Sequence, residues 1–235
     1  METNPHPIKN RLLAALPTDE YKRLQPHLES VQLSNRRILC EAGDFIRHAY
    51  FLNSGMGSLL ALTQAGATVE IAMVGNEGML GIPAILGAHK TPYEMMVQLP
   101  GEGVRIKTDV IRAEFKRAGV LQDLLLNYTH ALITQISQSA VCNRFHTVEK
   151  RLCRWLLLAH DRVQGDTFHL TQEIISYMLG TPRTGVTMAA GSLQDAGLIR
   201  YKRGKITIID RRGLEETSCE CYKIIVEGLD HFPAA

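Results

Sequence analysis

The distribution of glycine and proline along the 235-residue chain changes abruptly near residue 109. Upstream, residues 31–108 hold short apolar runs separated by glycines, a pattern typical of β-strands joined by turns. Downstream, residues 109–163 contain Gly119 as their single glycine and no proline, which favours long helices. The sequence therefore predicts an α+β fold, in which a glycine-rich β-domain is followed by helices.

Within the upstream region, two apolar runs at Gly57–Thr63 and Thr68–Val74 flank the turn-prone residues 64–67, which predicts a β-hairpin. Many short strands with glycine turns favour a barrel or a jelly roll. Residues 8–30 are predicted to be helical, because leucines recur there at roughly helical spacing: Leu12, Leu13, Leu16, Leu24 and Leu28.

The downstream region contains an apolar stripe with spacings of 4, 3, 4, 4 and 4 residues, which lies along one face of a long helix. Its members are Leu121, Leu125, Tyr128, Leu132, Ile136 and Ala140. This stripe could pack against the chain's own β-domain or against a second copy. The length of the helix, and polar residues around Gln135, Gln138 and Asn143, favour the second copy, so we predict a dimer interface there. Thr147 is predicted to cap a separate helix that continues through Trp155 to about residue 163.

Two short helices with a tight turn are predicted after residue 170. Thr171 can cap the first helix, and Gly180 can end it. Thr181 followed by Pro182 resembles a second helix start, with the proline at the first helical position. The buried stripe of the second helix is predicted to contain Val186, Ala189, Ala190, Leu193 and Ala196. Two helices joined by such a turn form a helix-turn-helix unit.

The second of these helices has the chemistry of a helix that reads a DNA groove. Arg183 can donate two parallel hydrogen bonds to a guanine, and threonines can contact bases or phosphates. After the helix, residues 198–208 resemble two strands around a basic tip at 203–205, which can reach phosphates as a wing. The predicted DNA-binding residues are Thr171, Gln172, Thr181, Arg183, Thr184, Thr187, Met188, Lys202, Arg203 and Lys205.

The charge distribution agrees with this interpretation. Residues 147–212 hold 11 lysines and arginines against 6 acidic residues, a balance of +5. The whole chain has 26 against 24, so the remainder holds 15 against 18, a balance of −3. The C-terminal third is therefore expected to face a polyanion. The competing interpretation is a helical hairpin that only packs, with its basic strand solvated.

With these segments in place, the chain resembles the Crp/Fnr-type regulators, the superfamily of the cyclic AMP receptor and the fumarate–nitrate regulator. The matching segments are strongest at Thr171–Ile199 and Gly43–Leu62. The resemblance implies a cyclic-nucleotide-binding-like jelly roll over residues 1–118, a dimerisation helix over 119–146 and a winged helix-turn-helix domain over 147–235. It also implies a homodimer on two-fold symmetric promoter DNA, and contact with RNA polymerase if the protein is an activator.

The sensor half departs from the cyclic-AMP-responsive members of that family. Those members hold the phosphate with a glutamate just after a glycine and with an arginine–serine pair on the next strand. Here the matching segments read Gly78–Ala84 and Tyr93–Val97, and neither contains an arginine. A buried phosphate would lack a cation, and Glu94 would repel it. Cyclic AMP binding in the usual way is thus not expected, and the effector stays open. The candidate pocket residues, by position alone, are Glu77, Gly81, Tyr93, Met95, Asn127 and Gln135.

The sequence gives little support for an iron–sulfur cluster, a haem or a catalytic metal site. No cysteine cluster precedes the β-domain as an iron–sulfur site would require, and single histidines such as His48 are more often structural than haem ligands. The nine histidines contain no His-x-His pair of the kind that metal-dependent jelly-roll enzymes use. We therefore expect no enzyme activity, no cofactor and no metal. A sensing module with a vestigial helix-turn-helix is a third interpretation, which the intact capping signals oppose.

The five cysteines are scattered and odd in number, which suits reduced thiols in a cytoplasmic protein: Cys40, Cys142, Cys153, Cys219 and Cys221. In sequence, the Cys219–Cys221 pair has no second pair or histidine nearby to complete a zinc site. Plain thiols are the favoured interpretation, and a thiol switch or a metal site is the alternative. The N-terminus has no apolar leader, and no run approaches the roughly 18 apolar residues of a membrane span.

Overall fold

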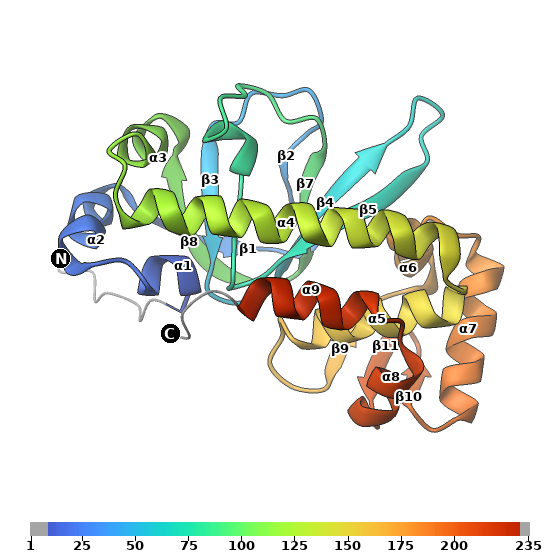
Figure 1. Cartoon of the computed structure of the whole chain (residues 1–235). Coiled ribbons are helices and arrows are strands. Elements are labelled where there is room, and N and C mark those ends of the chain that lie inside the picture. Colours follow the sequence, from blue (N-terminus) through green and yellow to red (C-terminus); the bar gives the residue numbers. More distant parts are fainter. Residues whose placement is uncertain (1–8, 231–235) are drawn as a thin grey trace.

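Two four-stranded antiparallel sheets form the N-terminal half of the computed structural model, which describes residues 9–230 (Figure 1). The first sheet has the order β1 (Glu29–Leu33), β8 (Gly101–Lys107), β3 (His48–Leu52), β6 (Met79–Leu80). The second has the order β2 (Ile38–Cys40), β7 (Glu94–Leu99), β4 (Met56–Leu62), β5 (Thr68–Val74). The predicted hairpin is confirmed as the antiparallel β4–β5 pair, and the predicted jelly roll is confirmed by the two-sheet arrangement. We call this domain the β-roll.

The helical segment predicted over residues 8–30 is confirmed in part: it is interrupted near Pro17, its last two residues belong to β1, and residue 8 lies outside the described residues. The segment forms α1 (Arg11–Ala14), α2 (Thr18–Leu24) and a 3-10 turn, η1 (Gln25–His27), before β1 begins. Pro17 occupies the N-cap of α2. Because proline lacks an N–H and restricts the residue before it, the chain cannot continue as one helix through this point. The leucine spacing therefore indicated helical faces correctly but missed the break.

The helical segment that follows is divided near Gly119. Helix α3 (Thr108–Phe115) precedes that glycine, and α4 (Val120–Phe145) follows it and runs along the β-roll (Figure 1). The ring of Tyr128 on α4 packs directly on Gly78, where an added Cβ would come within 2.3 Å of the ring. A side chain at that position would push α4 away, so this glycine fixes the close approach of helix and β-roll. None of the helices among residues 9–230 is long and apolar enough to cross a membrane.

The C-terminal part is a helical domain with a small sheet. Helix α5 (Val148–His160) starts at the predicted cap, where Thr147 Oγ1 accepts the Lys150 N–H at 3.4 Å. The other elements are β9 (Thr167–His169), α6 (Gln172–Leu179), α7 (Arg183–Asp195), β10 (Ile199–Lys202), β11 (Lys205–Ile208), α8 (Arg211–Thr217) and α9 (Cys221–Asp230). Helix α5 is buried continuously from Arg151 to Ala159, since it lies between the β-roll and the other helices. Helix α9 lies beside α4 (Figure 1).

Candidate DNA interface and sensor domain

Local signals in the sequence place the two helices of the helix-turn-helix. Thr171 Oγ1 accepts the Ile174 N–H at 3.2 Å, which caps α6. Gly180 ends α6 in the left-handed conformation, with φ of 54°. The predicted start of α7 is one residue early: Pro182 is the N-cap, the helix begins at Arg183, and no side chain caps it. Thr181 is half-buried beside the first turn and does not act as the predicted cap.

One face of α7 is buried and the opposite face is exposed. Val186, Ala189, Ala190 and Leu193 pack inward as predicted, whereas Ala196 is exposed. The exposed face carries Arg183, Thr184, Thr187 and Met188. Met188 is 75% exposed, more than any other large apolar side chain among the described residues. The hydroxyl of Thr187 lies 2.8 Å from Gln172 Oε1, so the start of α6 and the second turn of α7 are joined on this face.

The basic wing is a β-hairpin with a two-residue turn. Strands β10 and β11 pair Lys202 with Lys205, and the turn residues Arg203 and Gly204 both have positive φ, 52° and 73°. Such turns match the twist of antiparallel strands. The Leu170 N–H donates to the carbonyl of Gly204 at 2.8 Å, which holds the tip beside the start of α6. All three basic side chains, at 202, 203 and 205, are exposed there.

Two residues that position the wing were not found from the sequence. The Tyr201 N–H donates to Gln194 Oε1 at 2.9 Å, which joins the wing to α7. The Tyr201 hydroxyl donates to the Leu170 carbonyl at 3.2 Å. Neither residue belongs to a capping or charge pattern, so no signal in the sequence could have singled them out.

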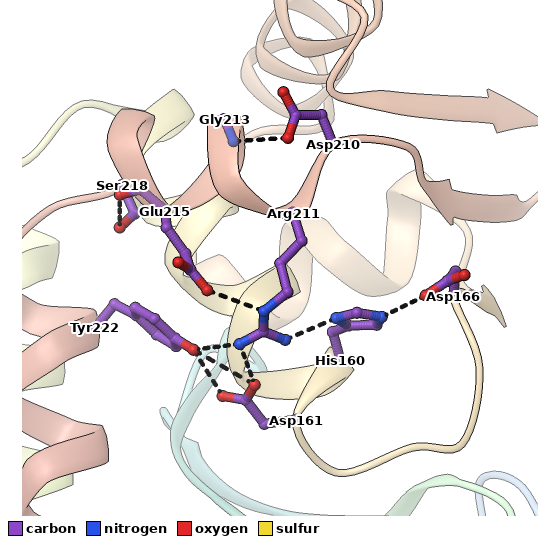
Figure 2. A network of polar contacts seen from close by, with 9 residues as sticks. All are labelled: His160, Asp161, Asp166, Asp210, Arg211, Gly213, Glu215, Ser218 and Tyr222. Carbon is purple, nitrogen blue, oxygen red and sulfur yellow. Dashed lines mark hydrogen bonds and ion pairs between the residues drawn. The ribbon is translucent and has the colours of Figure 1, made fainter.

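A polar network at the base of this domain holds its last helices together (Figure 2). Arg211 on α8 contacts Asp161 at 2.6 Å, the Tyr222 hydroxyl at 2.7 Å and His160 Nδ1 at 2.8 Å. A guanidinium only donates, so Nδ1 of His160 accepts, and its Nε2–H is directed to Asp166. Burial raises the pKa of the Tyr222 phenol. The network ties α9 to the end of α5.

The six predicted sensor residues do not form one open pocket. Asn127 is exposed, and Met95 is fully buried. Glu77 is ion-paired with Arg162 at 2.8 Å, and both side chains are almost fully buried. The amide of Gln135 donates to the Met73 carbonyl at 3.1 Å. These polar groups are therefore used inside the protein, which position along the chain could not reveal.

The remaining two of the six predicted sensor residues are Gly81 and Tyr93. Gly81 takes the left-handed conformation, with φ of 104°, at the start of a short 3-10 turn, η2 (Ile82–Ala84), whose Ile82 and Ala84 are buried. Tyr93 is half-buried, and this burial raises its pKa to about 12. A pocket of about 230 Å³ does open elsewhere, between the β-roll and α6, and its lining includes Leu60, Glu94, Met96, Ile174, Tyr177 and Met178.

The predicted dimer stripe needs a correction. Leu121, Leu125, Tyr128 and Leu132 are at most 4% exposed, and Ile136 packs against the same core. The chain's own β-roll covers these residues, so they cannot meet a second copy in this arrangement; Ala140 alone of the six is exposed. The large apolar residues exposed on α4 are instead Val120, Leu126, Ile133, Val141 and Phe145. A spacing near 3.6 defines a stripe, but it does not tell which partner covers the stripe.

Besides the Glu77–Arg162 ion pair, a hydrogen bond between Glu70 and Trp155 joins the β-roll to the C-terminal domain. Trp155 Nε1 donates to Glu70 Oε1 at 2.7 Å, and Ser58 hydrogen-bonds the other carboxylate oxygen. Burial raises the pKa of Glu70 to about 7, and these two hydrogen bonds oppose the rise without cancelling it. The carboxyl group therefore titrates near neutral pH at the contact between the two domains.

Comparison with known proteins agrees with this division. Residues 30–118 match the family described as a cyclic nucleotide-binding domain, and residues 150–217 match a Crp-like helix-turn-helix domain. The global nitrogen regulator of Nostoc sp. is 23% identical over 176 residues, which cover 71% of this chain and 78% of that protein.

Two solved structures show the same fold. A protein from Eubacterium rectale, described as a transcriptional regulator of the Crp/Fnr family, superposes with a TM-score of 0.70 at 18% identity over 88% of this chain and 96% of that one. FixK2 from Bradyrhizobium japonicum has a TM-score of 0.70 at 13% identity, over 82% and 98% of the two chains.

Proposed function

Because the chain belongs to the Crp/Fnr-type transcription regulators, which bind DNA and are not enzymes, we propose that it reads a specific operator as a homodimer, with a β-roll that does not bind cyclic AMP in the usual way. The observation that carries the proposal is the exposed face of α7 beside the basic wing. Arg183 on this face has no ion-pair partner within residues 9–230, so its guanidinium is available to a guanine.

The geometry of the reading surface supports distinct roles for its parts. Arg183, Thr184 and Thr187 lie in the first turns of α7, where recognition helices meet base edges. Met188 offers an apolar contact for a thymine methyl. The wing lysines and the start of α6 are arranged for phosphates, which fix the register of a protein on DNA.

The exposed face of α4 supports the homodimer. Leu126, Ile133 and Ala140 are seven residues apart and exposed, the spacing of a helix that pairs with its own copy. An Ile133→Asp variant is expected to be monomeric in sedimentation equilibrium and to lose operator affinity. Ile209→Asp is the matched control, since Ile209 is also about half exposed but lies outside α4. A dimeric Ile133→Asp variant would contradict this interface.

Two segments of the β-roll support the proposal that cyclic AMP is not bound in the usual way. The segment Gly78–Ala84 has apolar side chains and is buried apart from the half-buried Pro83, and β7 contributes Glu94 and no cation. Titration calorimetry with cyclic AMP is expected to show no binding at concentrations that saturate a responsive regulator. Saturable binding would contradict this part of the proposal and leave the DNA interface unaffected.

Selection of binding sites from random DNA tests the whole proposal. We expect two-fold symmetric sites with half-sites roughly 34 Å, or one helical turn, apart. Selected sites without symmetry would contradict the dimer, and failure to enrich any sequence would contradict specific recognition. Transcription in vitro from a promoter with the selected site then separates an activator, which would contact RNA polymerase, from a repressor.

A further inference from the structure

Four metal-ligating side chains that are distant in sequence meet where α4 ends and α9 begins. Cys142 and His146 are four residues apart at the end of α4, so they lie on one side of it. Cys219 and Cys221 flank Glu220 at the start of α9. The ligand atoms of the four residues all lie within 4.8 Å of one another. The three cysteines are buried, and His146 is half-buried.

The distances within this cluster match a single tetrahedral ion. With Zn–S bonds of about 2.3 Å and Zn–N bonds of about 2.0 Å, tetrahedral geometry separates two sulfurs by about 3.8 Å and a sulfur from a nitrogen by about 3.5 Å. Cys142 Sγ lies 3.5 Å from Cys219 Sγ, and Cys221 Sγ lies 3.6 Å from His146 Nδ1. A four-iron cluster would need more room, because each ligand then binds a different iron.

The surroundings of His146 provide an independent indication. Its Nδ1 faces Cys221, while its other ring nitrogen, Nε2, lies 3.3 Å from a carboxylate oxygen of Glu220. A histidine that binds a metal through one nitrogen usually donates its other N–H to a carboxylate, which fixes the ring. The arrangement of His146 between a thiol and a carboxylate is therefore that of a ligand with its supporting group.

A buried cation completes the charge balance. Three thiolates and Zn²⁺ together carry one negative charge, which is costly to bury alone. Arg154 on α5 is 6% exposed, its charge acts on both Cys142 and Cys221, and its Nε has no hydrogen-bond partner among the described residues. The guanidinium thus offsets the charge that such a site would bring into the interior.

We propose that Cys142, His146, Cys219 and Cys221 form a structural zinc site. The ion would clamp the end of the long helix to the start of α9, which the Arg211 network in turn holds to α5 (Figure 2). His146 occupies the C-cap of α4, next to the residue that caps α5. The site therefore fixes the angle at which the DNA-binding domain leaves the long helix. It rests on side-chain geometry and is independent of the DNA-binding proposal.

Metal analysis of the purified full-length chain tests this site without DNA. The protein is prepared under reducing conditions and dialysed against a mild chelator before elemental analysis. We expect about one zinc per chain in the wild type and in the control Cys40→Ser, whose thiol lies in the β-roll. Cys142→Ser and Cys219→Ser are expected to retain less than about a fifth of an equivalent. Equal zinc in all four proteins would overturn the assignment.

A second measurement on the wild-type chain covers the case in which the serine variants aggregate. Cobalt(II) added to the metal-free protein is expected to give intense thiolate charge-transfer bands and the visible bands of a tetrahedral ion, both of which zinc abolishes. Glu220→Gln is expected to keep one site but to weaken zinc binding about tenfold, as loss of a supporting carboxylate does. Absence of cobalt bands, or a Cys142–Cys219 disulfide in freshly prepared protein, would overturn the proposal.

Discussion

The DNA-binding domain and the β-roll use their polar side chains in opposite ways. On α7 and the wing, the basic and hydroxyl groups are exposed, and Arg183 forms no ion pair with the rest of the described chain. In the β-roll, Glu77 and Glu70 are buried, and each contacts a residue of the C-terminal domain. One region leaves its polar groups exposed to another molecule, whereas the other uses them to hold the two domains together.

The buried contacts make the boundary between the two domains sensitive to substitution. A buried carboxyl group that is paired across a domain boundary responds to anything that moves either domain, because separating the pair leaves a charge without a partner. The two carboxyl groups therefore hold the β-roll to Trp155 on α5 and to Arg162, which follows α5 in the chain. Variants that remove the buried carboxyl contacts are expected to change stability and its dependence on pH. Variants on α7 and the wing are expected to change DNA affinity.

The largest effect is expected for Arg162→Ala. This change leaves the buried Glu77 carboxylate without its partner, which typically costs about 3–5 kcal/mol of unfolding free energy. Urea unfolding measures the loss. Arg212→Ala is the matched control, because Arg212 is 87% exposed, and its loss is expected to change stability by less than about 0.5 kcal/mol.

A double variant with methionine at both 77 and 162 is expected to recover most of the stability that Arg162→Ala loses. If Arg162→Ala unfolds like the control, the ion pair does not join the domains.

The same contrast explains what could be predicted from the sequence. The helix-turn-helix carries local signals, such as Thr171 as a cap and Gly180 as a stop, and these act on the backbone next to them. Its fold and its exposed face could therefore be inferred. The partners of Glu77 and Glu70 lie 85 residues away in both cases, and no local pattern encodes such a pairing. The same reason hid the proximity of Cys142 and Cys219.

The predicted dimer stripe shows a different limit. A helix with apolar residues on two faces has two candidate interfaces, and periodicity ranks neither. The ring of Tyr128 packs on Gly78, so the face of α4 that carries Tyr128 lies against the β-roll. The sequence contains both residues, but only the fold brings them into contact. The break at Pro17, in contrast, was visible in the sequence and was outweighed by the leucine spacing.

Glu70→Gln is expected to alter the pH dependence of stability. The folded chain binds the Glu70 proton more tightly than the unfolded chain does, because the folded pKa is raised to about 7. Stability from this group is therefore present at acidic pH, falls as the pH rises from about 4.5 to about 7, and stays reduced above that. The glutamine variant removes this dependence, so we expect it to be more stable at pH 8 by up to about 3 kcal/mol.

The contact of Glu70 with Trp155 offers a direct readout. Trp155 is the single tryptophan of the chain, so its fluorescence reports this contact alone. The wild-type emission is expected to titrate with a midpoint near pH 7, and the Glu70→Gln emission to stay constant. Glu94→Gln is the control, since Glu94 lies on the same sheet and does not contact Trp155. A titration that persists in Glu70→Gln would assign the midpoint to another group.

Arg183→Ala is expected to act on DNA binding and not on stability. Loss of a bidentate contact to guanine costs roughly 1–3 kcal/mol, or about 5- to 150-fold in affinity for the selected operator, and relaxes the preference at one base pair. Arg212→Ala removes the same charge from an exposed site outside the reading face and is expected to bind nearly as the wild type does. Mobility shifts with the operator and its single-base variants measure both effects. An unchanged base preference would remove Arg183 from direct readout.

The smallest effect is expected for Lys202→Ala in the wing, and its character matters more than its size. Lys202 faces Lys205 across the two-residue turn, so removing one charge relieves a repulsion and does not weaken the hairpin. Alanine at Arg203 would be a poorer test, because that residue has a positive φ.

If Lys202 contacts phosphate, the affinity of Lys202→Ala falls by a similar factor for operator and for random DNA, and the slope of log K against log salt becomes shallower by about 1. Binding measured at several salt concentrations separates this outcome from base recognition. A loss confined to the operator would move Lys202 from the backbone to the bases, and the wing would then belong with Arg183 among the groups that read sequence.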